Sequence, residues 1–124
     1  MTTDIETNLN QARIHLENDE KQRAHDLLIE TLKIDPDSQS TLLMLGGYYF
    51  SESKLPEAEM IFEQLILLEP TTGQYSIALF NTLWKQERLD EAFEEIRRFM
   101  SVADKVTEKE TFDQYVEIAR KLSQ

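Results

Sequence analysis

Apolar residues recur along the chain at spacings of three and four, in segments separated by short polar breaks. This spacing places apolar side chains on one face of an α-helix. It predicts seven helices, over residues 6–18, 21–34, 39–52, 55–68, 74–86, 89–102 and 107–122. Pro36 and Pro70 each follow the end of a predicted helix, because proline cannot continue the helical hydrogen-bond ladder. Thr107 and Glu110 have the spacing of a capping box, so we expect the last helix to begin at Thr107.

The pattern repeats with a period of 34 residues. Alanine occupies the same place in three successive copies, at Ala24, Ala58 and Ala92. A larger apolar residue follows four positions later in each copy, at Leu28, Phe62 and Ile96. Periods of this length are typical of stacked helix–turn–helix units. We therefore predict an all-α solenoid of three repeats, over residues 5–38, 39–72 and 73–106, with a C-terminal capping helix over 107–122 that covers the last pair.

The recurring residues resemble the tetratricopeptide repeat (TPR). The second copy carries the signature best, and the first is divergent; the matching residues of the second copy are Leu42, Leu45, Gly46, Tyr49, Ala58, Phe62, Leu65 and Pro70. The resemblance implies that small residues, Ala12 and Gly46, let the two helices of a repeat approach closely, a rule that Phe80 breaks in the third copy. Every copy lacks glycine in the turn between its helices, so we expect strain or an altered turn at Asp19, Ser53 and Glu87.

The resemblance also implies that the first helix of each repeat lines a concave groove. The candidate partner-binding residues are two apolar slots per repeat and the position between them: Leu9, Arg13, Leu16, Leu43, Gly47, Phe50, Ile77, Asn81 and Trp84. We expect an apolar strip in which Phe50 and Trp84 are anchors and Gly47 leaves a gap for a ligand side chain. In the rival interpretation these residues are structural, or the groove is filled by a loop, a terminus or a second copy.

One ligand class of the family is excluded by the residues present. TPR domains that clamp the terminal carboxylate of chaperone tails use several basic and amide side chains, because such a clamp needs converging donors. The corresponding places here hold Leu9, Arg13, Met44, Gly47, Gln74 and Ala78. The apolar groove instead resembles that of small TPR chaperones, such as those serving bacterial secretion systems.

Charge narrows the choice of partner. The chain has 24 acidic and 13 basic residues, a net charge of −11, and the middle repeat, residues 37–70, carries six acidic groups and one basic group. Such a surface repels nucleic-acid phosphates and favours a basic or apolar protein partner. Cysteine is absent from the sequence, which excludes disulfides and thiolate metal sites. Without a secretory signal or a long apolar run, we expect a soluble cytoplasmic protein that does not enter a membrane.

Catalytic chemistry finds little support in the sequence. His15 and His25 lie on different predicted helices, so they do not form a local metal pair, and we expect them to be structural. Glu91, Glu94 and Glu95 are expected to form a solvated face with the arginines that follow them. We therefore predict a noncatalytic interaction module, an adaptor or chaperone, that uses no metal or cofactor and binds a partner peptide through apolar anchors.

An alternative function is self-association. We expect the first helix to expose Ile5, Leu9 and Leu16 on a side without a neighbour in the chain. This surface would allow a homodimer, which could form through the N-terminal repeat or through the groove.

Overall fold

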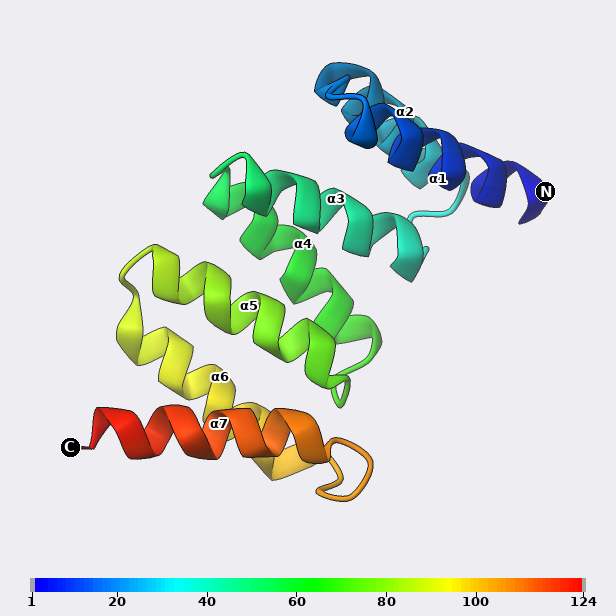
Figure 1. Ribbon diagram of the computed structural model, residues 1–124. Helices are drawn as coiled ribbons and strands as arrows, with labels where there is room; N and C mark the ends of the chain where they lie inside the picture. The colour runs from blue at the N-terminus through cyan, green and yellow to red at the C-terminus, as the bar shows by residue number, and fades with distance from the viewer. Residues whose placement is uncertain (1, 124) are drawn as a thin grey trace.

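The computed structural model describes residues 2–123, which form seven α-helices and no strand (Figure 1). The helices are α1 (Thr2–Glu17), α2 (Lys21–Ile34), α3 (Gln39–Ser51), α4 (Leu55–Leu68), α5 (Gly73–Lys85), α6 (Leu89–Val102) and α7 (Lys109–Leu122). They follow one another in space in chain order, from α1 at one end to α7 at the other. The all-α solenoid is confirmed, and most helix boundaries agree with prediction to within two residues; α1 begins four residues early.

The two helices of a repeat meet where one side chain is small. Gly46 of α3 faces Phe62 of α4 so closely that an added Cβ would lie 2.5 Å from Phe62 Cε1. Ala12 fills the equivalent place in the first repeat and is fully buried. In the third repeat the equivalent positions hold Phe80 and Ile96, and both side chains are buried. The third repeat therefore accommodates two large side chains where the second has a glycine beside a phenylalanine.

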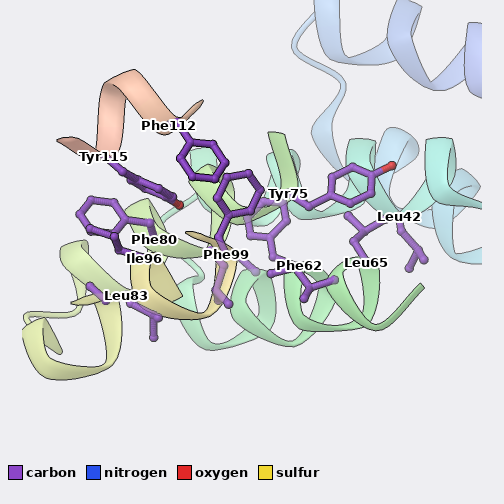
Figure 2. Packing of buried hydrophobic residues seen from close by; sticks show 14 residues of the cluster. Leu42, Phe62, Leu65, Tyr75, Phe80, Leu83, Ile96, Phe99, Phe112 and Tyr115 are labelled. Atoms are coloured by element: carbon purple, nitrogen blue, oxygen red, sulfur yellow. The ribbon is translucent and has the colours of Figure 1, made fainter. Parts of the chain in front are cut away.

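The core continues from the repeats into the capping helix. Buried residues form a small cluster across α1 to α3 and a larger one that extends from α3 to α7. Figure 2 shows Phe112 and Tyr115 of α7 facing Phe80 and Phe99. The Tyr115 ring lies 5.7 Å from Phe80 and 5.8 Å from Phe99 between centroids, and Tyr115 is fully buried. The last pair of helices is thus covered by α7, as predicted.

The start of α7 differs from its predicted position. The helix begins at Lys109, two residues later than predicted, and Thr107 is not its cap. Instead, the Asp104 carboxylate accepts hydrogen bonds from the N–H groups of Val106 and Thr107, at 2.7 and 3.0 Å, and these backbone bonds lower the pKa of Asp104. Thr107 therefore belongs to a turn that Asp104 stabilises. The Asp104 carboxylate accepts from two free backbone N–H groups, whereas the Thr107 hydroxyl accepts from none.

Glu108 joins the start of α7 to the start of α5. Its carboxylate accepts a hydrogen bond of 3.0 Å from the N–H of Gly73, the first residue of α5. Helix N-termini have unpaired N–H groups, so an acidic side chain from a neighbouring element can cap them. Gly73 is required for this approach, because an added Cβ would lie 2.1 Å from Thr111 Oγ1.

The expected strain in the turns within repeats is confirmed. Asp19, Ser53 and Glu87 have φ angles of 61°, 58° and 60°, in the left-handed region. In the second repeat, the N–H of Ser53 bonds to the carbonyl of Phe50 and that of Lys54 to Tyr49, at 3.1 and 2.9 Å. This is the Schellman arrangement, which ends a helix with one left-handed residue that is usually glycine. Each of the three turns therefore has a residue with a side chain at a position where glycine, which lacks one, is preferred.

Replacing such a residue with glycine should stabilise the protein. We expect Glu87→Gly to raise the free energy of unfolding by about 1 kcal/mol, because glycine adopts this backbone conformation without steric cost. Urea unfolding monitored by circular dichroism measures the change. The matched control is Gln114→Gly at an exposed helical position of α7, which should lower stability by about 1 kcal/mol. Two losses of equal size would contradict the argument.

The adjacent glycines Gly46 and Gly47 should respond differently to the same substitution. Gly46→Ala forces the buried Phe62 ring to move, and such overpacking costs about 1–3 kcal/mol. A Cβ at Gly47 meets no atom within 4 Å, so Gly47→Ala should gain about 1 kcal/mol from helix propensity alone. Thermal and urea unfolding should therefore rank Gly47→Ala above wild type and Gly46→Ala below Gly47→Ala by about 2 kcal/mol. Equal stability of the two variants would refute this assignment.

Candidate functional site

Three shallow hollows lie between neighbouring first helices. One of about 500 Å³ separates α1 from α3 and is lined in part by Leu9, Arg13 and Leu43. A second, of about 330 Å³, includes Leu16, Leu43 and Gly47. A third, of about 260 Å³, lies between α3 and α5 and includes Gly47, Phe50, Ile77 and Asn81. Leu43 belongs to the first two hollows and Gly47 to the last two, so the hollows follow one another along one surface, the first-helix groove.

Eight of the nine residues named from the sequence line this groove, and Trp84 does not. The Trp84 ring stacks on Phe80 at 5.7 Å and meets the edge of Phe93 of α6 at 6.3 Å, between centroids. Its side chain remains 38% exposed, but it lies outside the three hollows. Of the two aromatic anchors expected from the sequence, Phe50 therefore lines the groove and Trp84 does not.

The third hollow is the most suited to an apolar side chain. Phe62 forms part of its floor, Phe50 and Ile77 line it with Ala78, and exposed Gln74 and Asn81 provide amide groups beside them. Amide side chains can donate to and accept from the backbone of an extended segment. The surface around Gly47 is open, because nothing lies within 4 Å of the place where its Cβ would be. The hollow therefore combines an apolar pit with hydrogen-bonding groups at its edge.

Basic side chains lie at separate points along the groove. Lys85 Nζ lies 5.0 Å from the centre of the Phe50 ring, a distance at which an ammonium group is attracted to an aromatic face. Lys21 in the second hollow pairs with Glu52 at 3.1 Å, and the Glu52 carboxylate raises the pKa of Lys21. Arg13 in the first hollow donates to Asn10 at 2.8 Å. The basic groups that line the groove are thus spread along it and do not converge on one point.

The first helix exposes less apolar surface than the sequence suggested. Leu9 was expected to be exposed, but it is only 8% exposed and packs in the smaller core cluster with Ala12 and Leu28. Ile5 and Leu16 are half-buried and pack against the same cluster. The repeat turns these side chains toward α2 and α3, because burial there contributes more than exposure at the open end.

Both histidines take part in contacts within the fold. His15 Nδ1 lies 2.9 Å from Glu20 Oε1, and His25 Nε2 lies 2.9 Å from the hydroxyl of Tyr49. The His25 ring also sits 5.5 Å from the Tyr48 ring, so it joins α2 to α3. Within the described residues, no group of three or more His, Cys, Asp or Glu could hold a metal ion. None of the helices described is long and apolar enough to cross a bilayer.

Glu95 is buried, which corrects the expectation that it belongs to a solvated face. It is 6% exposed and is the only charged side chain that is buried among the described residues. Arg98 donates to both of its carboxylate oxygens, at 2.8 and 2.6 Å, and Ser76 donates to it at 2.6 Å. The hydroxyl of Tyr115 lies 2.6 Å from Ser76 Oγ. Because the single Ser76 proton goes to Glu95, Tyr115 donates to Ser76, and the chain of bonds links α5, α6 and α7.

The sequence contained a signal for this network that the motif comparison missed. Glu95 occupies the register position that Leu27 and Ile61 fill in the other repeats, where both are half-buried. A charged residue in place of two buried apolar ones requires a partner within the fold. Its direct partners are Ser76 of α5 and Arg98 of α6, and Tyr115 of α7 extends the network through Ser76.

Removing the Tyr115 hydroxyl should change stability in alkali. Burial raises the pKa of Tyr115 above its ordinary value. The unfolded chain therefore loses this proton at a lower pH than the folded chain, and stability falls as pH rises above about 10, by about 1.4 kcal/mol per pH unit. Below that pH the contribution is fully present. We expect Tyr115→Phe to unfold with a shallower alkaline decline in urea titrations between pH 8 and 11.5.

At neutral pH the same variant should be less stable by about 1 kcal/mol, because the buried Ser76 oxygen loses its donor. Tyr75→Phe is a suitable control at neutral pH, since Tyr75 donates to Gln39 at 2.7 Å away from the network. Burial also raises the pKa of Tyr75, so wild type alone is the reference for the alkaline slope. Identical alkaline slopes for wild type and Tyr115→Phe would contradict the assignment of the raised pKa.

Comparison with known proteins identifies the fold. No protein-family model and no curated protein sequence matches the chain. Solved structures do match. The Yersinia enterocolitica type III secretion translocator chaperone SycD superposes with a TM-score of 0.77 at 13% identity, over 99% of this chain and 92% of SycD. The first TPR of Spaghetti (RPAP3), bound to an HSP90 peptide, gives 0.74 at 14% identity, over 98% of each chain.

A third neighbour, MamA MSR-1, gives a TM-score of 0.68 at 19% identity over 79% of this chain. The match takes in 56% of MamA, so this chain spans about half of that protein. The resemblance inferred from the 34-residue period is confirmed: the chain has the tetratricopeptide-repeat fold. At these identities the comparison establishes the fold and leaves the ligand to be argued from the groove.

Proposed function

We propose that this protein is a noncatalytic interaction module, an adaptor or chaperone, whose first-helix groove binds a segment of a partner protein through apolar anchor side chains. The observation that carries the proposal is Gly47. Its neighbour Gly46 is explained by packing against Phe62, but nothing in the fold fills the space over Gly47. Glycine inside a helix costs about 1 kcal/mol relative to alanine, so its presence at an open, apolar hollow favours a binding role.

The neighbours support this class of function. RPAP3 is seen with a bound peptide, and SycD is a chaperone. The peptide bound to RPAP3 is SRMEEVD, which is acidic toward its end. In the present groove, Arg13 and Lys21 are the basic lining residues of the three hollows, and they lie in different hollows. We therefore infer a ligand held by apolar side chains in the hollow beside Phe50 and Ile77, in place of one clamped by its terminal carboxylate.

Self-association is the alternative, and the structure gives it less support. The buried Leu9 reduces the apolar surface that α1 could offer to a second copy. Two chains of net charge −11 also repel each other unless the interface excludes their acidic surfaces. Sedimentation velocity at several concentrations separates this alternative from peptide binding, because a dimer blocked by a groove variant would identify a second copy as the ligand.

Filling the gap over Gly47 should block binding without harming the fold. Peptides selected from a displayed library on the wild-type protein are expected to bind Gly47→Leu at least tenfold more weakly, because the leucine occupies the third hollow. Urea unfolding should show that Gly47→Leu is as stable as wild type. Gly47→Ala is the matched control and should retain most of the binding.

A fluorescent SRMEEVD peptide serves as the ligand control, measured by anisotropy on the same proteins. It should bind wild type at least tenfold more weakly than the selected peptides. Undiminished binding of the selected peptides to Gly47→Leu would place their site elsewhere, and tight binding of SRMEEVD would contradict the apolar anchor.

A further inference from the structure

The outer side of α4 carries an apolar ridge that the other two repeats lack. Met60 and Leu67 are 70% and 82% exposed. The 34-residue period gives an internal comparison, because the same outer positions are also exposed in α2 and α6. Those positions hold Asp26 and Lys33 in α2, and Glu94 and Ser101 in α6. Since the repeat accepts charged and polar residues there, packing does not require the apolar side chains of α4.

Met60 and Leu67 form one stripe on the helix. Seven residues are about two helical turns, so the two side chains project in nearly the same direction, with Glu63 between them. Phe62 of the same helix lies about 160° around the axis from Met60 at 100° per residue, and it forms part of the groove floor. The ridge and the first-helix groove therefore face away from each other across α4.

The surroundings of the ridge are acidic. The Glu63 carboxylate makes no ion pair or hydrogen bond with the described residues, whereas its neighbour Glu59 pairs with Arg88. Glu63 lines a hollow of about 300 Å³ with Glu91, Glu94, Glu95 and Arg98, over the apolar side chains of Leu79 and Leu83. Each of the other three carboxylates has an arginine partner, Arg88 for Glu91, Arg97 for Glu94 and Arg98 for Glu95, so Glu63 is the carboxylate of the hollow that no described cation pairs with. Burial, followed by the charge of Glu59, raises the pKa of Glu63, and the charge of Arg88 opposes this shift. The apolar ridge thus borders an acidic hollow through a residue that they share.

We propose that the ridge of Met60, Glu63 and Leu67, with its adjoining hollow, docks a basic amphipathic helix of a partner protein. Apolar residues two turns apart match the spacing at which a docked helix presents its own apolar anchors. Lysine or arginine beside those anchors complements the unpaired Glu63 carboxylate and the adjoining hollow, which has four carboxylates and one guanidinium. A second copy of this chain fits poorly, because a symmetric pair would bring the acidic ridges together. The ridge is separate from the groove, so one molecule can hold two partners.

The test exchanges the ridge for the residues that the third repeat carries at the same positions. Met60→Glu combined with Leu67→Ser reproduces the outer side of α6, where the fold accepts both residues. The probe is a labelled, helix-stapled synthetic peptide with leucines seven residues apart and lysines beside them. A second peptide has the same leucines with glutamates in place of the lysines. Fluorescence anisotropy measures the binding of both peptides at 50 and 200 mM salt.

We expect the lysine peptide to bind wild type at least tenfold more tightly than the double variant, and more weakly at the higher salt. The glutamate peptide should bind at least tenfold more weakly than the lysine peptide. Gly47→Leu should leave lysine-peptide binding unchanged, which separates failure of the ridge from failure of the groove. Glu63→Lys provides a second variant with the apolar pair intact, and it should weaken lysine-peptide binding at least threefold.

Three outcomes would overturn the proposal. They are no saturable binding of the lysine peptide to wild type, equal binding of the two peptides, and equal binding of the lysine peptide to wild type and to a folded ridge variant. Sedimentation velocity adds a fourth. A wild-type dimer that Met60→Glu with Leu67→Ser converts to monomer would show that the ridge pairs with a second copy of the chain.

Discussion

The close approach of two helices within each repeat determines most of this structure. At Gly46 the backbone of α3 comes so near to Phe62 that no Cβ fits without displacement of the ring. That contact fixes the rotation of α3 about its axis, and the rotation directs the next residue, Gly47, into the groove. The corresponding positions hold Ala12 and Leu28 in the first repeat and Phe80 and Ile96 in the third. The packing of one residue thus determines the direction in which the next residue along the helix faces.

The repeat period was sufficient to predict the architecture, because every repeat solves the same packing problem. It located the strained turns, which recur in all three repeats, and the helix pairs that they join, while the spacing of apolar residues located the capping helix. The errors concern residues whose environment depends on the ends of the stack. Glu95 is buried in a network that Tyr115 of α7 completes through Ser76, and Thr107 is not a cap because Asp104 organises the preceding turn. A periodic pattern contains no information about contacts that occur once.

Trp84 illustrates how one exchange in the core changes the surface. Leu16 and Phe50, its counterparts, line the groove, and the residues four positions before them are Ala12 and Gly46. Before Trp84 the same position holds Phe80, and side chains four residues apart on a helix are neighbours. The two rings stack, and Trp84 leans over Phe93 of α6. The groove slot could be predicted from the period, but the orientation of its side chain depended on the bulk at position 80.

The middle repeat joins the two surfaces that we assign to binding. α4 contributes Phe62 to the groove and Met60 and Leu67 to the ridge, and α3 contributes Gly47 and Phe50. In a repeat array each unit is stabilised by its immediate neighbours, so local opening of this repeat would disrupt both surfaces together. A ligand that binds one face and orders α3 and α4 therefore lowers the entropic cost of binding for a ligand on the other face. Any coupling between the two faces is reciprocal, because it is carried by the same pair of helices.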